Sequence, residues 1–233
     1  MYGDVKHEFV KTSNVKRFEA GVLRLEQRGA PEATLMVVGG NVGLGKSGTG
    51  QWFAAQHGYP YVRLKPAASR GWLLGDICAA LSMPTAGRID QRFKDISKAM
   101  VKRRVGLVVD EVEHGLAGGG ATLEMVRALG DDTEQPIILI GRGHVKSSIE
   151  RVEAVWSRVS AVVDFERLTA DDYAALAKAH GLTADPRVAT AMCAKAEGSL
   201  RLAMNLLKRL RATAERARSN VITADMVEAT DVH

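Results

Sequence analysis

The sequence predicts an α/β fold: a five-stranded parallel sheet flanked by helices and followed by a small all-helical domain. Three observations carry this prediction. Short apolar runs alternate with long stretches whose residues suit helices. A glycine-rich segment directly follows the first of these runs, and strand signals stop after residue 165 while helical patterns continue. Because alternating strands and helices are joined by crossover connections, they build a parallel sheet with both faces covered.

The first predicted element is a helix over residues 14–28, where apolar side chains recur at helical spacing from Val15 to Leu25. Ser13 or Asn14 can serve as its N-cap. Five short apolar runs then predict the strands of the sheet. These strands are Thr34–Val38, Tyr59–Leu64, Val105–Val109, Pro136–Ile140 and Ala161–Phe165.

The last part of the chain contains only helical patterns. Thr169 and Thr223 are suited to cap helices, Gly181 to end one, and Pro186 to stand in a first helical turn. The predicted helices are Ala170–His180, Pro186–Ala196, Ser199–Ser219 and a short fourth one near Thr223–Ala229.

Composition sets the class of protein. The chain has 233 residues, of which 46% are hydrophobic and 25% charged, so it can bury a substantial core and is not disordered. Apolar residues never run on for the length of a membrane span, and the first residues lack the apolar segment of a signal peptide. We therefore expect a cytoplasmic protein. Cys78 and Cys193 each lie in an apolar helical run, which predicts buried thiols rather than a disulfide or metal site.

The glycine-rich segment matches G-x-x-x-x-G-K-[ST] at every fixed position. A strand precedes it and a helix over residues 48–57 follows it, so its backbone N–H groups can surround phosphate oxygens. Lys46 is predicted to lie between the β- and γ-phosphates of ATP, and the Ser47 hydroxyl to join the Mg²⁺ coordination sphere. The predicted nucleotide-binding residues are Gly40, Asn41, Val42, Gly43, Leu44, Gly45, Lys46, Ser47 and Gly48.

Two adjacent carboxylates close the third predicted strand. Asp110 at a strand end beside the phosphate loop is predicted to hold Mg²⁺, usually through water, and Glu111 to orient and deprotonate the attacking water. Glu113 continues the acidity, and for it and His114 a plain loop role is the favoured interpretation. The chain is thus predicted to be an ATP hydrolase that uses ATP and Mg²⁺.

These motifs together resemble an AAA+ ATPase module over nearly the whole chain. The resemblance rests on the phosphate loop, the sequence VVDE, a fourth strand, an Arg before the fifth strand, and Gly-Ser-Leu-Arg at the start of a late helix. It implies an N-terminal segment and helix over residues 1–32, a nucleotide-binding α/β domain over 33–166 and a helical lid over 167–233. More narrowly, residues 9–17, GLGKS and DEVEH resemble the transposition proteins typified by the phage Mu B protein.

The AAA+ resemblance assigns roles to two arginines and leaves one position open. Arg158 matches the arginine finger, which reaches the γ-phosphate bound by a neighbouring subunit, and Arg201 matches the sensor that contacts phosphate from its own chain. Where the family carries a small polar sensor after the fourth strand, this chain has Gly141–His144. Arg142 or His144 can replace that sensor. A weakened water-positioning group predicts slow turnover without DNA or a partner.

A basic loop follows the second predicted strand. The net charge is +5 and the pI near 9.3, which favours an anionic partner. In related initiator-like and transposition ATPases this region faces DNA, so the resemblance points to Lys65 and Arg70, with Arg63 and Ser69 as weaker choices. No base-reading motif is visible, so contacts are predicted to be made with the phosphates of double-stranded DNA.

Three other features have favoured interpretations that do not involve DNA. Lys102, Arg103 and Arg104 precede the third strand and are predicted to solvate a helix end. Trp72 and Trp156 are predicted to pack in the core or at an interface.

The favoured function is an ATP-dependent, oligomerising, largely sequence-independent DNA-binding ATPase that regulates transposition by capturing target DNA and activating a transposase. We expect it in the cytoplasm of a bacterial host cell, as a ring or helical filament with the arginine finger acting in trans, and not at a membrane. One alternative is a helicase loader or other nucleic-acid ATPase. Another is a regulator of export or signalling that does not bind DNA.

Overall fold

The computed structural model describes residues 9–232, and the chain divides into two compact units. The unit called here the sheet unit comprises residues 17–42 and 46–165. The unit called the helical unit comprises residues 9–16, 43–45 and 166–232 of the described chain. The N-terminal residues that were expected to lack a signal peptide lie mostly outside the described residues. Within the described residues, no helix is long and apolar enough to cross a membrane.

The sheet unit contains a five-stranded sheet with the order β2-β3-β4-β1-β5, in which every pairing is parallel. This confirms the predicted fold. The two central strands, β4 and β1, are buried, and Leu35 of β1 pairs with Ile137 of β4. The strands are β1 (Leu35–Gly40), β2 (Tyr61–Arg63), β3 (Leu107–Asp110), β4 (Ile137–Ile140) and β5 (Val159–Phe165).

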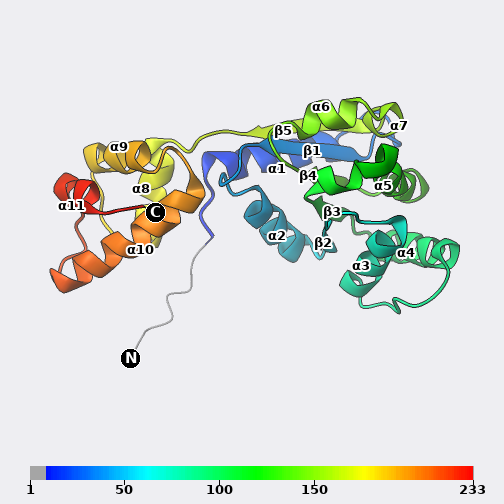
Figure 1. Cartoon of the computed structure of the whole chain (residues 1–233), viewed down its shortest axis with the longest axis horizontal. Coiled ribbons are helices and arrows are strands. Elements are labelled where there is room, and N and C mark those ends of the chain that lie inside the picture. Colours follow the sequence, from blue (N-terminus) through cyan, green and yellow to red (C-terminus); the bar gives the residue numbers. More distant parts are fainter. Residues whose placement is uncertain (1–8, 233) are drawn as a thin grey trace. The chain divides into compact units, whose positions relative to one another are not determined.

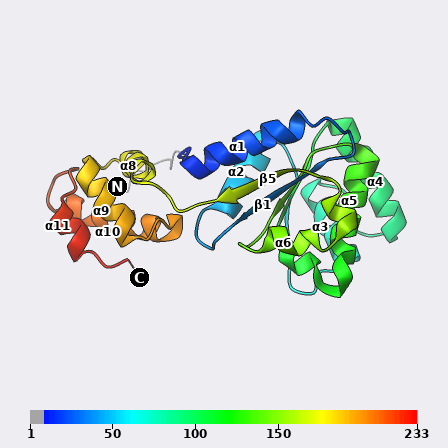
Figure 2. The ribbon, with the colours of Figure 1, turned by 90° about the horizontal axis from the view of Figure 1, so that it is seen from above.

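Helices cover both faces of this sheet. Figure 2 shows α1 and α2 on one side of β1 and β5, with α6 on the other. Phe18 of α1 meets Phe53 of α2 edge to face, with ring centroids 5.4 Å apart. The helices of this unit are α1 (Ser13–Glu26), whose first turn belongs to the helical unit, α2 (Lys46–His57), α3 (Arg70–Ala80), α4 (Ile89–Arg103), α5 (Ala121–Thr133), α6 (Val145–Glu150) and α7 (Glu153–Trp156). Short 3-10 turns, Val112–Gly115 and Ala117–Gly120, precede α5.

Two helices, α3 and α4, lie between β2 and β3 (Figure 1). Pro84 and Gly87, the latter with φ 123°, fall in the segment that separates them. The buried sides of both helices join the core on one face of the sheet, which includes Leu74, Ile96 and Leu139. Arg103 ends α4 and donates from Nη1 to the Leu81 carbonyl at 2.9 Å, so the cluster at residues 102–104 does lie at a helix end.

The helical unit has a core of its own, built from α8 (Ala170–Ala179), α9 (Pro186–Lys195), α10 (Leu200–Arg216) and α11 (Ala224–Ala229). Thr169 and Thr223 are N-caps, and Pro186 stands in the first turn of α9, as predicted. Tyr173 and Leu206 are fully buried in this core.

One prediction about burial needs correction, that for Cys193, and the prediction for the two tryptophans is narrowed. Cys78 is buried but Cys193 is only half-buried, although both thiols are free. Trp156 is half-buried against the core, whereas Trp72 is 58% exposed and so is not a core residue. Trp72 lies in the first turn of α3, on the side opposite to Leu73 and Leu74, which take the buried positions.

Candidate nucleotide-binding site

The phosphate loop connects β1 to α2, the position that its sequence predicts. Lys46 is the first residue of α2 and is only 9% exposed. Its Nζ donates to the carbonyl oxygens of Gly40 at 2.6 Å and Asn41 at 2.8 Å. Burial lowers the pKa of Lys46, while the charges of Asp110 and Glu113 raise it. The ammonium therefore lies within electrostatic reach of both carboxylates and at the start of a helix, where anions are favoured.

Gly40 shows why the loop needs glycine. Its φ is 125°, and a Cβ built there would lie 2.6 Å from the Phe165 carbonyl oxygen. A side chain would clash with β5 and would be strained by the backbone conformation as well. Glycine therefore lets the backbone turn sharply as it leaves β1.

Asp110 ends β3 and is almost fully buried, at 2% exposure. The Tyr61 hydroxyl donates to its Oδ2 at 2.5 Å, and the Glu111 backbone N–H donates to its Oδ1 at 2.9 Å. Arg63, the register partner of Asp110 on β2, places its Nε 3.4 Å from Oδ2. Burial raises the pKa of Tyr61 to about 12, so the hydroxyl keeps its proton and remains a donor. Asp110 is thus a buried carboxylate of fixed orientation.

Glu111 differs from its neighbour in backbone and exposure. It has φ 54° and ψ 43°, a left-handed conformation that is uncommon for a non-glycine residue. Its half-exposed carboxylate lies 3.7 Å from Arg63 Nε and 3.4 Å from His114 Nε2. The chain turns sharply between the two acids, so one is buried at the strand end and the other stays close to solvent.

Glu113 lies at the same edge of the sheet, although the sequence favoured a plain loop role. Its Oε1 is 2.9 Å from Arg142 Nε, in an ion pair without the alignment of a hydrogen bond. A Cβ on Gly141 would lie 3.0 Å from Glu113 Oε2, so the carboxylate lies against the end of β4. Arg142, one of two residues considered as a replacement sensor, is therefore paired with an acid. His144 precedes α6 and is exposed.

A comparison with known protein families agrees with this arrangement of the phosphate loop and the acids at the ends of the strands. The family model described as "AAA domain" matches residues 30–147, which cover β1 to the start of α6. The chain belongs to the AAA domain family. No curated protein matches it.

Solved AAA structures share the fold at low sequence identity. The chain is similar to the Aeropyrum pernix ORC2 protein in its ADPNP–ADP complexes, with TM-score 0.69 and 16% identity over 95% of this chain and 68% of that one. For the Thermotoga maritima RuvB Holliday junction branch migration motor the TM-score is 0.59, with 18% identity over 93% and 68%. For the Aeropyrum pernix ORC1 protein in complex with DNA it is 0.61, with 17% identity over 98% and 66%. These likenesses establish the AAA+ fold.

The two arginines that the AAA+ pattern singles out have different surroundings. Arg158, directly before β5, donates from Nε to Asp131 Oδ1 at 2.8 Å. Arg201 lies in the first turn of α10 in the helical unit, and its side chain is exposed. Within that unit, which includes residues 43–45, the Arg201 backbone N–H donates to the Gly43 carbonyl at 3.0 Å.

The residues predicted to face DNA divide into two groups in this AAA protein. Lys65 and Arg70 are exposed, and their side chains have no ion-pair or hydrogen-bond partner among residues 9–232. By contrast, Arg63 contacts Asp110 and Glu111, and the Ser69 hydroxyl accepts from the Trp72 N–H as the N-cap of α3. Arg70 is thus a helix residue and not part of the loop that the sequence predicts.

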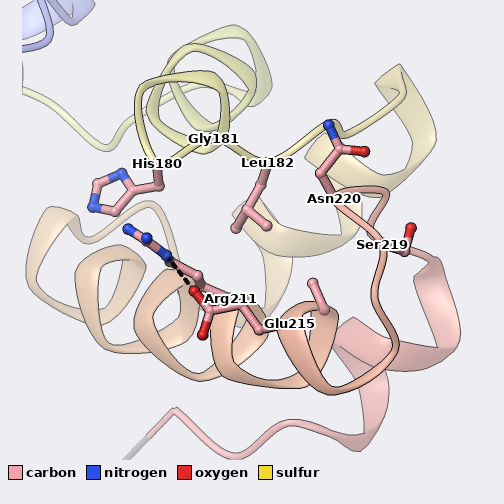
Figure 3. Close-up of a pocket in the computed structure, with 8 residues that line it drawn as sticks. His180, Gly181, Leu182, Arg211, Glu215, Ser219 and Asn220 are labelled. Carbon is pink, nitrogen blue, oxygen red and sulfur yellow. Dashed lines mark hydrogen bonds and ion pairs between the residues drawn. The ribbon is translucent and has the colours of Figure 1, made fainter. Parts of the chain in front are cut away.

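The helical unit also has a pocket of about 200 Å³ (Figure 3). His180 and Arg211 line one side, and Ser219 and Asn220 the other. Arg211 donates to Glu215 at 3.0 Å within the pocket wall, so the two charges balance. The pocket therefore lacks the net positive charge that would favour a phosphate.

Proposed function

We propose that this AAA protein is an ATP-dependent, oligomerising ATPase that binds duplex DNA and regulates transposition. The observation that carries the nucleotide part is the shared site of Lys46 and Asp110. A buried ammonium at the end of a glycine-rich turn lies within electrostatic reach of a buried carboxylate on a parallel strand. Burying two charges near each other is costly, and titratable groups gathered in this way favour a ligand-binding role.

The donors present fit a magnesium nucleotide. The Ser47 hydroxyl and the Asp110 carboxylate are the hard oxygen ligands that Mg²⁺ prefers, and Mg²⁺ when bound would neutralise charge on the phosphates. Lys46 and the backbone N–H groups of residues 40–48 would hold the phosphate oxygens. Glu111, beside the buried acid but open to solvent, would act as the base toward the attacking water.

Hydrolysis would depend on assembly. Arg201 would contact the phosphates from its own chain, and Arg158 would reach the γ-phosphate held by a neighbouring copy, because guanidinium groups bridge phosphate oxygens well. Glu113 pairs with Arg142 where the family carries a small polar sensor. Slow turnover by the isolated subunit is the expected consequence, and it suits a switch.

DNA binding is supported by the surface at the start of α3. Lys65 and Arg70 are exposed, and Arg70 lies in the first turn of a helix, where a cation opposes the helix dipole. This placement does not stabilise the helix, which favours a role in binding an anion. The net charge of +5 and the likeness to an ORC1 protein solved with DNA support the same partner. Because Arg63 and Ser69 have internal partners, Lys65 and Arg70 are the main contacts in our proposal.

The transposition role rests on the resemblance of residues 9–17, GLGKS and DEVEH to the Mu B-type transposition proteins. In this proposal ATP favours an assembly that aligns many weak phosphate contacts, and hydrolysis releases DNA or the transposase.

Retention on arbitrary duplex DNA in ATP and in ADP tests the proposal, with electron microscopy of both samples. We expect ATP-dependent retention in oligomers and a steep loss of affinity with salt. Equal, weak retention in both nucleotides would favour a regulator that does not act on DNA. A second assay measures strand transfer by a purified transposase with and without this chain, in ATP. Stimulation supports the transposition role, whereas binding to a replicative helicase without stimulation would point to a helicase loader.

A further inference from the structure

Arg158 is held by a carboxylate of the same chain. Its Nε donates to Asp131 Oδ1 at 2.8 Å, and its Nη1 donates to Ser157 Oγ at 3.1 Å. The Arg158 and Asp131 side chains are 29% and 27% exposed, so the pair lies at the surface without being fully solvated. Among the described residues, nothing is shown to bond to Nη2.

Asp131 also binds a second arginine. Arg127, one turn earlier on α5, donates from Nη1 to Asp131 Oδ2. The two guanidinium groups thus take one carboxylate oxygen each. Their combined charge with Asp131 is +1, so the cluster still attracts an anion. The neighbouring Asp132 is exposed and makes no such contact.

The backbone on both sides of this cluster is tied to the start of β1. A Cβ on Gly130 would lie 2.3 Å from Thr34 Oγ1, which shows how closely α5 approaches the residue before β1. The Arg158 carbonyl accepts from the Leu35 N–H at 2.9 Å. Asp131 and Arg158 therefore stand on elements that are both fixed by the same strand, and their relative position is set by the fold.

We propose that Asp131 is the positioning residue for Arg158: it holds the guanidinium by Nε and leaves Nη2, the terminal nitrogen that Ser157 does not bind, to reach the γ-phosphate bound by a second copy of the chain. This inference rests on the assignment of Arg158 in the proposed function. A free arginine loses rotamer entropy when it is fixed. Fixing it before assembly removes that cost from the encounter with the nucleotide.

The test uses subunits that complement each other. Each hydrolytic site would need Lys46 from one chain and Arg158 from the next. Asp131→Asn and Arg158→Ala are each assayed alone and mixed with Lys46→Ala, in ATP and DNA. We expect Asp131→Asn alone to lower turnover at saturating ATP by about 10- to 100-fold, with unchanged ATP affinity of the isolated subunit. Mixing with Lys46→Ala should restore turnover, as it should for Arg158→Ala.

Two further variants separate positioning from support of the fold. Asp132→Asn removes the neighbouring charge and should keep turnover within about twofold of the wild-type value. Asp131→Glu keeps the charge but moves the carboxylate, so positioning predicts reduced turnover even if Asp131→Asn unfolds at a lower temperature. Wild-type turnover in Asp131→Glu would show that the carboxylate only supports the fold and would overturn the inference.

The remaining outcomes are distinct. Wild-type or faster turnover in Asp131→Asn, with loss in Arg158→Ala, overturns the positioning role and leaves the proposed function intact. Wild-type turnover in Arg158→Ala removes the finger assignment itself. A wild-type chain that neither assembles nor hydrolyses ATP contradicts the proposed function on which the inference depends.

Discussion

Asp110 and Asp172 are both buried carboxylates, at 2% and 6% exposure, but their partners differ in kind. Asp172, in the helical unit, accepts from the backbone N–H groups of Ser13 and Thr169 at 2.7 and 2.9 Å, and from both hydroxyls at 2.7 and 3.1 Å. Two of these donors belong to Thr169, the N-cap of α8, and two to Ser13, the first residue of α1. Asp172 therefore has a complete set of structural partners.

Asp110 accepts fewer hydrogen bonds than Asp172. Its donors are a tyrosine hydroxyl and one backbone N–H, with an exposed arginine nearby and Lys46 within electrostatic reach. The comparison teaches that burial alone does not mark a functional acid. A carboxylate whose donors all come from helix starts holds the fold together. A carboxylate at a strand end, within electrostatic reach of a buried lysine, can also bind a ligand.

Glu111→Gln is expected to have the largest effect, and it separates the buried acid from its neighbour. Loss of a general base lowers turnover by about 10²- to 10⁴-fold, while Asp110 still supports nucleotide binding. Single-turnover hydrolysis and ATP affinity, measured on the same preparation, check this. Weakened ATP binding with unchanged turnover would reverse the two roles.

Asp110→Ala should weaken Mg²⁺–ATP binding by roughly 30-fold or more, because the substitution removes the buried carboxylate that is proposed to bind Mg²⁺. Titration calorimetry with and without Mg²⁺ measures it, and the loss should vanish in EDTA. Lys46→Ala, the matched control, should weaken binding in both conditions. If Asp110→Ala binds Mg²⁺–ATP like the wild-type chain, Asp110 is as structural as Asp172 and the comparison fails.

Asp172→Ala should lower the free energy of unfolding of the helical unit by about 1–3 kcal/mol, since buried donors lose their acceptor. Burial raises the pKa of Asp172, but the hydrogen bonds from Ser13 and Thr169 outweigh it, so the pKa is lowered overall. A lowered pKa gives stability that is present above the unfolded-state pKa of about 3.9 and is lost as pH falls further.

Denaturant unfolding of the Asp172→Ala variant at pH 7 and pH 3 measures this, and the difference from wild type should shrink at the lower pH. Asp171→Ala, which removes the exposed neighbour, should cost only about 0.5 kcal/mol. Equal costs for the two variants would refute the structural role of Asp172.

The smallest expected effects concern cationic side chains, which can be compared in the same way as the two carboxylates. Lys46 is buried and bonded, whereas Lys65 and Arg70 are exposed without internal partners. Lys65→Ala and Arg70→Ala should each weaken duplex DNA binding several-fold and reduce the slope of log affinity against log salt by about one. Lys102→Ala, at the end of α4, is the control and should leave the slope unchanged. No change in the slope for either test variant would remove this surface from the proposal.

Features that depend on residues close together along the chain could be predicted from the sequence. The strand predictions differ from the structure by at most two residues at any end, because buried parallel strands need continuous apolar runs. The phosphate loop was recognisable because its glycines adopt backbone conformations with positive φ that few other residues tolerate. Helix caps such as Thr169 follow the same logic, since cap and capped N–H groups are close in sequence.

Contacts between distant segments were not readable. The split of residues 70–103 into α3 and α4, the burial of Glu113 against β4 and the pairing of Arg158 with Asp131 all join residues whose proximity no local pattern encodes. Trp72 shows the same limit: helical spacing did not reveal that it faces solvent.

By itself, the sequence determined the five strands, the helices of the helical unit, the phosphate loop and the acid pair at the end of β3, because each depends on residues adjacent along the chain. Only the tertiary structure decided that Tyr61 and Arg63 hold Asp110, that Ser13 joins Thr169 in binding Asp172, and that Asp131 binds two arginines. The physical reason is that charged side chains pair with residues that are close in the folded structure but distant along the chain. Their partners are fixed by how strands and helices pack, and that packing is a property of the whole fold.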